Sequence, residues 1–272
     1  ILGHNRPLIV DLGSVNYPSQ DKDRYYHFNS DGHNQVTLGG RPQRYDLEHE
    51  AVCVASDFDN ARGGWWRIDL TDLHEGVTAV RRTVIHLLPD IVVVFDEAQL
   101  HGPESIRLRW HPGGEPELGP AGRFCVTVDE VTLSAQIHAL GLDPADLQSG
   151  HHAYVAPYDQ DRIGNPMPQQ REPYVDLGVA GKHARLLSLF AIGAVGESVP
   201  DWRRTGPASW SWDGQTPSGE AGSMSPVAPS AESVSRSTPD TQPGAASVTH
   251  VQVEADHICV QGPAGSWRVP IA

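Results

Sequence analysis

The chain has 272 residues, the size of one large domain or two small ones. Its 27 glycines and 22 prolines are well above the ~12% that these two residues contribute to an average protein. This excess argues against a helical bundle and indicates many short elements joined by turns. The apolar residues, 39% of the chain, are enough for a hydrophobic core and exclude wholesale disorder. A net charge of −14 excludes nucleic acid as an expected partner, because phosphates require a basic surface.

No segment of the sequence approaches the ~20 consecutive apolar residues of a membrane span, and no signal peptide opens the chain. The sequence begins at Ile1 within a predicted strand, so we interpret it as a processed or truncated piece of a longer protein. Its three cysteines, Cys53, Cys125 and Cys259, lack CxxC spacing, which argues against a zinc-ribbon or thioredoxin-type site. We expect three buried free thiols, with one disulfide as the alternative.

Strand-like segments follow one another along most of the chain. Each is rich in β-branched residues and bounded by Gly, Pro, Asp or Asn, which is the pattern of β-strands. In chain order they are residues 7–11, 35–38, 51–55, 77–88, 91–97, 105–111, 124–128, 131–139, 183–192, 248–253, 257–260 and 267–269. No segment of helix length has a 3.6-residue apolar period. The sequence therefore predicts an all-β fold, a multi-stranded antiparallel β-sandwich with few or no helices.

Three short stretches indicate burial and turns in more detail. Residues 91–95 are an unbroken apolar run, so we expect neighbours to cover both faces of this strand. Residues 106–110, with the sequence IRLRW, alternate apolar and basic side chains, which predicts one buried face and one face in water. Residues 88–90, with the sequence LPD, join two apolar runs and are predicted to form a hairpin turn.

The composition changes at residues 217–247. Most of these residues are Pro, Ser, Gly, Ala or Thr, and none is aromatic. Such a segment buries too little apolar surface to offset the entropy lost on ordering it, so it is predicted to be a flexible insertion. Because strand-like residues resume at Val248, we expect residues 1–272 to form one sandwich domain that carries this insertion.

The residues best suited to chemistry lie in the first 45 positions. Asp11 ends an apolar segment, and His33 and Asn34 directly precede the next one. Adjoining ends of two neighbouring strands would bring Asp11 and His33 to one point, as a carboxylate–imidazole pair or as two of three protein ligands of a zinc ion. The structural alternatives are a turn residue at Asp11 and a hydrogen-bonded surface histidine at His33.

The connection between these two segments carries further candidates, namely Tyr17, Arg24, Tyr25 and Tyr26. A phenol, a guanidinium and paired aromatic rings are what a site for acidic sugars needs, as proton carrier, carboxylate clamp and stacking faces. The structural alternatives are ordinary sheet aromatics and a solvated charge. The pair Trp65-Trp66 offers another stacking surface for sugars, although buried packing is the simpler interpretation.

This order of residues resembles a known family. A strand that ends at Asp11, then Tyr17, Arg24 with its neighbouring aromatics, and finally His33-Asn34 before a Val-Thr strand is similar to the C-terminal β-sandwich domain of heparinase II/III-like polysaccharide lyases. Residues 80–84, 91–96 and 108–112 are similar to the downstream hairpin of that domain. The resemblance covers most of residues 1–115 and implies a sandwich of the supersandwich type.

The resemblance also implies an activity. The family cleaves uronate-containing polysaccharides, such as heparin, heparan sulfate or alginate, by β-elimination. By this resemblance Tyr17 and His33 are the catalytic residues, which handle the C5 proton and the leaving oxygen. Arg24, Tyr25 and Asn34 are substrate-binding residues, and Asp11 and His33 are ligands of a structural Zn²⁺. Secretion or a periplasmic location is implied by the family alone.

The chain departs from the family in two respects. The family's first zinc histidine lies upstream of Asp11, where this chain has only ten residues, and His4 is too close to Asp11 to replace it. The family's large upstream α/α toroid is absent from the chain. We therefore expect the chain to be the β-sandwich portion of a lyase, in contact with an upstream toroid domain and inactive without it.

The net charge of −14 opposes binding of a polyanionic substrate, because like charges lower encounter rates. A local basic patch formed by Arg6, Arg24, Arg41 and Arg44 would reconcile the two. The alternative function is a non-catalytic carbohydrate-binding or structural β-sandwich domain. A short distance between the Asp11 carboxylate and the His33 imidazole would favour the lyase.

Overall fold

The computed structural model describes residues 1–11, 30–44, 46–141, 147–153, 159–160, 163–166, 171–197, 199–214 and 247–271. Strands make up most of this part of the chain, and its helices are two single 3₁₀ turns, η1 (Ser30–Gly32) and η2 (Thr71–Leu73). The predicted all-β fold is confirmed. None of the described helices is long and apolar enough to cross a membrane. The insertion predicted at 217–247 lies outside the described residues, apart from its last residue.

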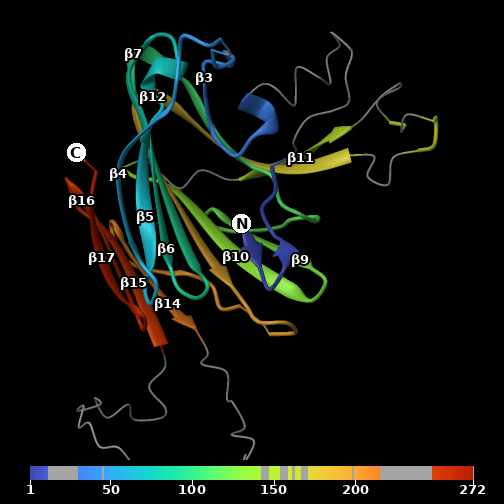
Figure 1. Cartoon of the computed structure of the whole chain (residues 1–272), viewed down its shortest axis with the longest axis vertical. Coiled ribbons are helices and arrows are strands. Elements are labelled where there is room, and N and C mark those ends of the chain that lie inside the picture. Colours follow the sequence, from blue (N-terminus) through green and yellow to red (C-terminus); the bar gives the residue numbers. More distant parts are fainter. Residues whose placement is uncertain are drawn as a thin grey trace, which may run out of the picture.

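Ten strands form one large antiparallel sheet, which is the main layer of the fold (Figure 1). Its path runs through β4 (Val52–Asp59), β5 (Gly63–Asp69), β6 (Val77–Leu87), β7 (Ile91–Trp110), β12 (Arg171–Ile192), β10 (Val131–Ala139), β9 (Arg123–Val128) and β8 (Glu117–Gly119). In addition β3 (Val36–Leu38) pairs with β7, and β11 (Gln148–Ala153) pairs with β12. The hairpin of β1 (Leu2–Gly3) and β2 (Arg6–Pro7) opens the chain.

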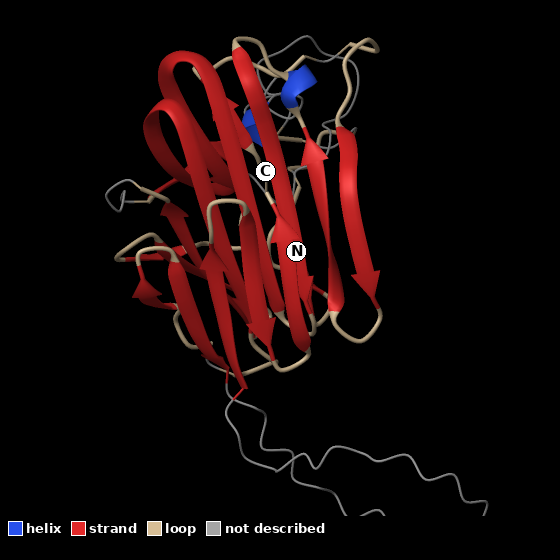
Figure 2. Cartoon of the chain, turned by 90° about the vertical axis from the view of Figure 1, so that its left-hand side faces the viewer, coloured by secondary structure: helices blue, strands red, loops and turns tan. Residues whose placement is uncertain are grey.

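A second, five-stranded sheet packs on one face of the large sheet and completes the sandwich (Figure 2). Its strands are β13 (Arg203–Gly206), β14 (Ser209–Gly214), β15 (Ser247–Val253), β16 (His257–Gly262) and β17 (Gly265–Pro270). Between the sheets, Phe95 and Leu187 of the large sheet and Trp210 and Ile258 of the small sheet share one buried core. A second core, which includes Leu8 and Leu108, involves the N-terminal hairpin region, β3 and much of the large sheet.

Strand β7 is longer than predicted, because residues 91–97 and 105–111 belong to one continuous strand, Ile91–Trp110. The predicted strands left out residues 98–104, which include Gly102 and Pro103. In the structure, the pairing of β7 with β12 is interrupted between Gln99 and Glu104, so Pro103 lies where a backbone N–H is not needed by that ladder. The strand therefore passes through a proline without ending.

The burial of β7 agrees with the sequence in its first half and differs in its second. Val93 and Phe95 are fully buried within the sandwich, as the unbroken apolar run predicts. Arg107 is half-exposed, as expected for the wet face, but the prediction for Arg109 was wrong, since it is only 4% exposed. A carboxylate on the neighbouring strand explains this burial and is described below.

The remaining sequence expectations have mixed outcomes. Residues 88–90 form the predicted turn between β6 and β7. Trp65 is buried between the sheets, whereas Trp66 lies on the opposite face and stacks on Phe58, with 6.2 Å between ring centroids. All three cysteines are free, as expected, but none of them is buried, and Cys53 is exposed on β4.

Three histidines, His74, His111 and His138, are held in the neutral form by the fold. Burial lowers the pKa of each to about 4, with a smaller contribution from a nearby arginine charge: Arg41 for His74, Arg109 for His111 and Arg204 for His138. The His138 ring packs on the Trp210 ring at 4.7 Å between centroids. Because the unfolded chain binds protons at these positions near pH 6.5, protonation favours unfolding.

We therefore expect the free energy of unfolding to be fully retained above pH 6.5 and to fall as the pH decreases from 6.5 towards 4. Each of these histidines contributes a slope of at most about 1.4 kcal/mol per pH unit. The substitution His138→Gln should flatten the slope, while His101→Gln, at an exposed position, should leave it unchanged. Urea unfolding at several pH values measures both slopes. Equal slopes for His138→Gln and the unsubstituted chain would refute this assignment.

Candidate functional site

Asp11 and His33 lie in direct contact. The His33 Nδ1 atom is 2.8 Å from Asp11 Oδ2, and both side chains are accessible, at 32% and 57% exposure. Residues 8–10 run alongside the end of β7, where the Val10 amide donates to the His111 carbonyl at 2.9 Å. His33 precedes β3, which pairs with the same part of β7. The end of β7 therefore brings together the two residues that the sequence places 22 positions apart.

Asn34 fixes the backbone next to this pair. Its side-chain amide donates to the Val10 carbonyl at 2.6 Å and accepts from the His111 amide at 2.7 Å. The Asn34 carbonyl in turn accepts a hydrogen bond from the Arg82 guanidinium. Asn34 thus ties the residue before Asp11 to the end of β7, and its predicted contact with substrate stays a prediction.

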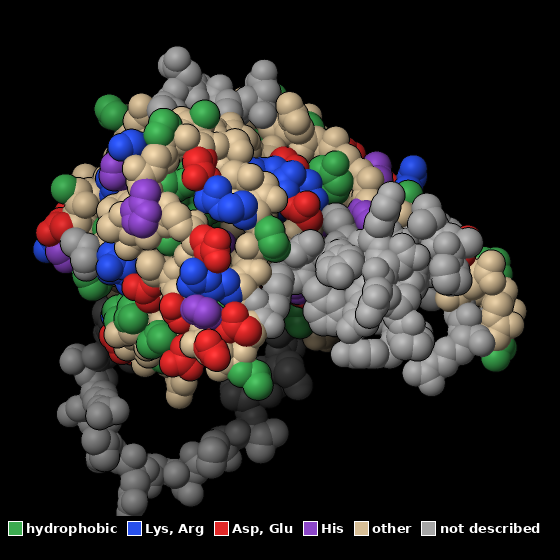
Figure 3. Space-filling view, turned by 90° about the horizontal axis from the view of Figure 1, so that it is seen from above, with side chains coloured by type: hydrophobic (Ala, Val, Ile, Leu, Met, Phe, Trp, Pro, Cys, Tyr) green, Lys and Arg blue, Asp and Glu red, His purple; other side chains and the backbone are tan. Residues whose placement is uncertain are grey.

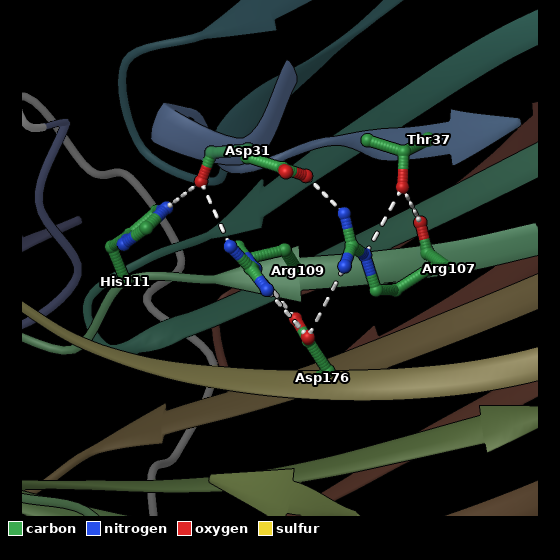
Figure 4. Close-up of polar contacts among 6 residues, drawn as sticks. All are labelled: Asp31, Thr37, Arg107, Arg109, His111 and Asp176. Atoms are coloured by element: carbon green, nitrogen blue, oxygen red, sulfur yellow. Dashed lines mark hydrogen bonds and ion pairs between the residues drawn. The ribbon is translucent and has the colours of Figure 1, made fainter. Parts of the chain in front are cut away.

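An ionic network supports η1, which leads into His33 (Figure 4). Arg109 binds the Asp176 carboxylate through two hydrogen bonds of 2.7 Å and donates to the Asp31 carbonyl at 3.2 Å. Arg107 binds the Asp31 carboxylate and donates to Thr37 Oγ1 at 3.2 Å. The His111 imidazole meets the same Asp31 carbonyl at 3.0 Å. Side chains from the end of β7 and from β12 therefore hold Asp31, two residues before His33.

The centre of this network is a buried ion pair. Arg109 and Asp176 face each other across β7 and β12 and have side-chain exposures of 4% and 13%. The Arg109 guanidinium also lies 3.7 Å above the centre of the Tyr174 ring, which adds a cation–π contact. Charges this deeply buried are tolerated only because they are paired and hydrogen-bonded. The pair orders β7, β12 and η1 relative to one another.

A cavity of about 470 Å³ lies between the N-terminal hairpin and the large sheet. Its lining includes Trp66, Arg82 and Trp110, together with the N-terminal hairpin. Arg82 connects the cavity to the site, because it donates to the Asn34 carbonyl while two hydrogen bonds of 2.6 and 2.9 Å hold it on Asp96. One side chain, Arg82, therefore contacts both the backbone next to His33 and this partly aromatic cavity.

Three of the predicted site residues, Tyr17, Arg24 and Tyr25, lie outside the described residues. Of the predicted basic patch, the three described arginines all pair with carboxylates. Arg6 is 3.0 Å from Asp129, Arg41 is 2.6 Å from Glu104 and Arg44 is 3.5 Å from Glu75. Figure 3 likewise shows basic and acidic side chains next to one another on the described surface. These arginines do not provide uncompensated positive charge.

One group of three side chains in the described part of the chain has its His, Asp and Glu ligand atoms at the spacing of metal ligands. The ligand atoms of Glu254, Asp256 and His257 all lie within 4.8 Å of one another, at the turn between β15 and β16. Asp11 and His33 have two ligand atoms in contact, but a third His, Cys, Asp or Glu does not complete the group among the described residues. The sequence predicted the proximity of Asp11 and His33. It gave no indication of the group formed by Glu254, Asp256 and His257.

Most of the supporting residues were also missed. Arg107, Arg109 and Asp176 lie in strands, where charged residues are normally taken for solvent-facing positions. The available signal was two arginines within an otherwise buried strand end, which require carboxylate partners on neighbouring strands. Asp176 was not assigned to any strand, so the sequence did not indicate that partner.

Comparison with known families now identifies the chain. A family model described as heparinase II/III-like, C-terminal, matches residues 3–160, more than half of the 272 residues. The chain belongs to this family. The matched residues include Asp11, His33 and Asn34 and the whole of β7, but not Asp176 of the buried ion pair. No sequence among the curated proteins matches the chain significantly.

Solved structures of heparinases share this fold over nearly the whole chain. A heparinase III is 12% identical with a TM-score of 0.62, and the match covers 97% of this chain and 34% of that protein. Heparan sulfate lyase HepC from Pedobacter heparinus is 13% identical with a TM-score of 0.59. The match covers 98% of this chain and 35% of that protein. At these identities the similarity establishes the fold. The heparinase-like chain spans about a third of the length of these proteins.

We expect removal of Asp176 to destabilise the fold strongly, because it takes the carboxylate away from the buried Arg109 charge. Asp176→Ala should lower the free energy of unfolding by about 3–5 kcal/mol. Asp129→Ala removes the exposed partner of Arg6 and should cost less than about 1 kcal/mol. Chemical denaturation of both variants gives the comparison. A loss at Asp176 as small as that at Asp129 would show that the network does not hold β7, β12 and η1 together.

Proposed function

We propose that this chain is the β-sandwich portion of a polysaccharide lyase that cleaves uronate-containing polysaccharide by β-elimination. The observation that carries the proposal is the contact of His33 Nδ1 with Asp11 Oδ2 at 2.8 Å, next to a backbone fixed by Asn34. Family membership and the names of the structural neighbours, which are heparin or heparan sulfate lyases, support it. The substrate class is therefore a heparin-, heparan sulfate- or alginate-like polymer.

The geometry suits proton transfer by His33. A carboxylate that accepts from Nδ1–H fixes the imidazole tautomer and leaves Nε2 free to exchange a proton with a bound sugar. β-Elimination requires removal of the C5 proton next to the uronate carboxylate and protonation of the leaving oxygen at C4. In this proposal His33 and Tyr17 divide these two proton transfers. Arg24 clamps the uronate carboxylate, and Tyr25 stacks on the sugar ring.

Asn34 has a different part in the proposal from the one that the resemblance implies. Both ends of its amide already bind the backbone of Val10 and His111. In this proposal Asn34 contributes to substrate binding indirectly. It holds Val10 beside the end of β7 and so positions the residues of the site. The neighbouring cavity with Trp66 and Trp110 offers the sugar aromatic surface.

In this proposal Asp11 and His33 have a second role as ligands of a zinc ion. An imidazole and a carboxylate are suitable ligands for Zn²⁺, and the two ligand atoms are already adjacent. Such an ion would fasten the end of the N-terminal segment to the start of β3. A nitrogen that binds zinc does not take up a proton, so chelation separates this structural use from the catalytic one.

The active enzyme in this proposal is longer than the present chain. The chain spans about a third of the neighbouring lyases, so we assign the remaining substrate contacts to an upstream α/α toroid domain. We expect the chain by itself to be inactive. A non-catalytic carbohydrate-binding domain is the second candidate, and the stacked Phe58 and Trp66 rings favour it, because Phe58 is 66% exposed.

The full-length protein should release products with 4,5-unsaturated uronate ends, which absorb ultraviolet light, from at least one uronate polymer. His33→Ala should lower the initial rate by a factor of about 10²–10⁴, the usual contribution of a positioned acid or base. His49→Ala is the matched control, because His49 forms a similar exposed pair with Asp46 at 2.6 Å. It should leave the rate unchanged.

Two results would decide against the lyase. One is a folded full-length protein without absorbance change on heparin, heparan sulfate or alginate. The other is an equal effect of His33→Ala and His49→Ala. Binding of these polymers without cleavage, measured by calorimetry, would instead support the carbohydrate-binding domain.

A chelator tests the zinc at Asp11 and His33. In this proposal, removal of zinc from the full-length enzyme should lower its melting temperature, and Asp11→Asn should make that decrease smaller. Metal analysis of the protein before and after chelation provides an independent measurement. A full-length protein that contains no zinc and keeps its melting temperature with the chelator would leave the pair with its proton-transfer role alone.

A further inference from the structure

We propose that Glu254, Asp256 and His257 form a binding site for a divalent transition-metal ion such as zinc. The three residues lie at the turn from β15 to β16 in the five-stranded sheet, whereas Asp11 and His33 lie beside the large sheet. The proposed site is therefore independent of the Asp11–His33 pair and of the proposed lyase activity.

The ligand atoms are already close enough to share an ion. All three lie within 4.8 Å of one another, and His257 Nδ1 is 2.9 Å from Asp256 Oδ1. Two ligands of a tetrahedral zinc ion with bonds of about 2.0–2.2 Å are roughly 3.3–3.6 Å apart. Small rotations of the Glu254 and Asp256 side chains are therefore sufficient to bring three ligands onto one ion.

The His257 imidazole gives a second reason to expect a ligand. Its Nδ1 atom is turned away from solvent and faces Asp256 Oδ1 at 2.9 Å, within the group, although the side chain as a whole is 26% exposed. A metal ion bound at the nitrogen lone pair would at the same time neutralise the two neighbouring carboxylates.

The backbone holds the three residues in place. The Glu254 amide donates to the His257 carbonyl at 2.8 Å, which closes the turn, and the Ile271 amide donates to the Asp256 carbonyl at 2.8 Å. Arg185 of β12 donates to the Glu254 carbonyl at 2.9 Å. The site is thus built on a hairpin anchored to the large sheet and to the end of the chain, which limits the ordering cost of binding.

The donor set favours zinc or a similar metal over calcium and magnesium. An imidazole suits the borderline transition metals, while calcium and magnesium prefer oxygen ligands alone. The Cys259 sulfur lies 3.8 Å from Glu254 Oε1 and adds a soft donor at the edge of the group. Arg268, which is 64% exposed, lies 3.3 Å from Glu254 Oε2 and would move aside into solvent when the ion binds.

Calorimetry with zinc chloride on the full 272-residue chain tests the site. His33→Ala serves as the background, so that binding at the Asp11–His33 pair does not contribute. In this background we expect one zinc ion per chain and a higher melting temperature with zinc. Adding His257→Ala or Asp256→Asn should weaken zinc binding at least about tenfold and remove the thermal shift. Adding His49→Ala, at the exposed His49–Asp46 pair, should change neither.

Circular dichroism confirms that each variant is folded before the comparison. The proposal is overturned if the background protein does not bind zinc, or if zinc binds as tightly after His257→Ala and Asp256→Asn as before. It is also overturned if magnesium and calcium bind as tightly as zinc, since a site without histidine would then suffice. None of these results depends on lyase activity, so the two proposals fail separately.

Discussion

The pairing of β7 with β12 is the interaction on which the rest of the structure depends. The two strands are matched from Trp110 opposite Val175 to Ile91 opposite Ala191, with one irregularity at Gly181 and His183. Before that irregularity, β7 lies between β6 and β12; beyond it, β7 lies between β3 and β12. One pair of long strands thus joins the core between the sheets to the core under the N-terminal hairpin. The paired residues lie far apart in the sequence, which makes this pairing a slow step of folding.

The candidate site is a consequence of where β7 ends. Strand β7 ends at Trp110. Backbone groups at this end form hydrogen bonds with Val10, Gln35 and Asn34. These hydrogen bonds bring together the segment that ends at Asp11 and the segment that contains His33. Arg107 and Arg109 supply the cations that fix the second segment through Asp31. The exposed pair of Asp11 and His33 is therefore supported by a charged network whose centre, Arg109 and Asp176, is buried.

The sequence predicted much of this arrangement. Apolar periodicity located most strands, because alternation and β-branched residues are local properties. The contact between Asp11 and His33 could also be predicted from the sequence, because polar residues at the adjoining ends of two neighbouring strands lie close together. The residues that support the pair were not. Whether Arg109 faces water or Asp176 depends on which strand lies beside β7, and that is a property of the topology.

The same reasoning explains the two clearest misjudgements. Residues 98–104 were left out of the predicted strands, but they belong to β7, where an interrupted ladder removes the need for a backbone N–H at Pro103. Glu254, Asp256 and His257 went unnoticed because a short turn rich in charge usually indicates only a solvated loop. They are brought together by backbone hydrogen bonds of the β15–β16 hairpin and of Ile271. The amino-acid composition of the turn does not predict these hydrogen bonds. In both cases a non-local contact determined the role of a local residue.

The charge balance of the domain constrains how an acidic sugar could be received. Arg82, Arg107 and Arg109 lie closest to the site, and each is bound to a carboxylate of the domain itself. A uronate would have to compete with groups held at fixed distance, whose effective concentration exceeds that of any dissolved substrate. Displacing them would also break contacts that hold His33 in place. These three arginines are therefore poorly placed to neutralise a uronate as well. In the proposed lyase that part falls to Arg24 and to the part of the enzyme beyond this chain.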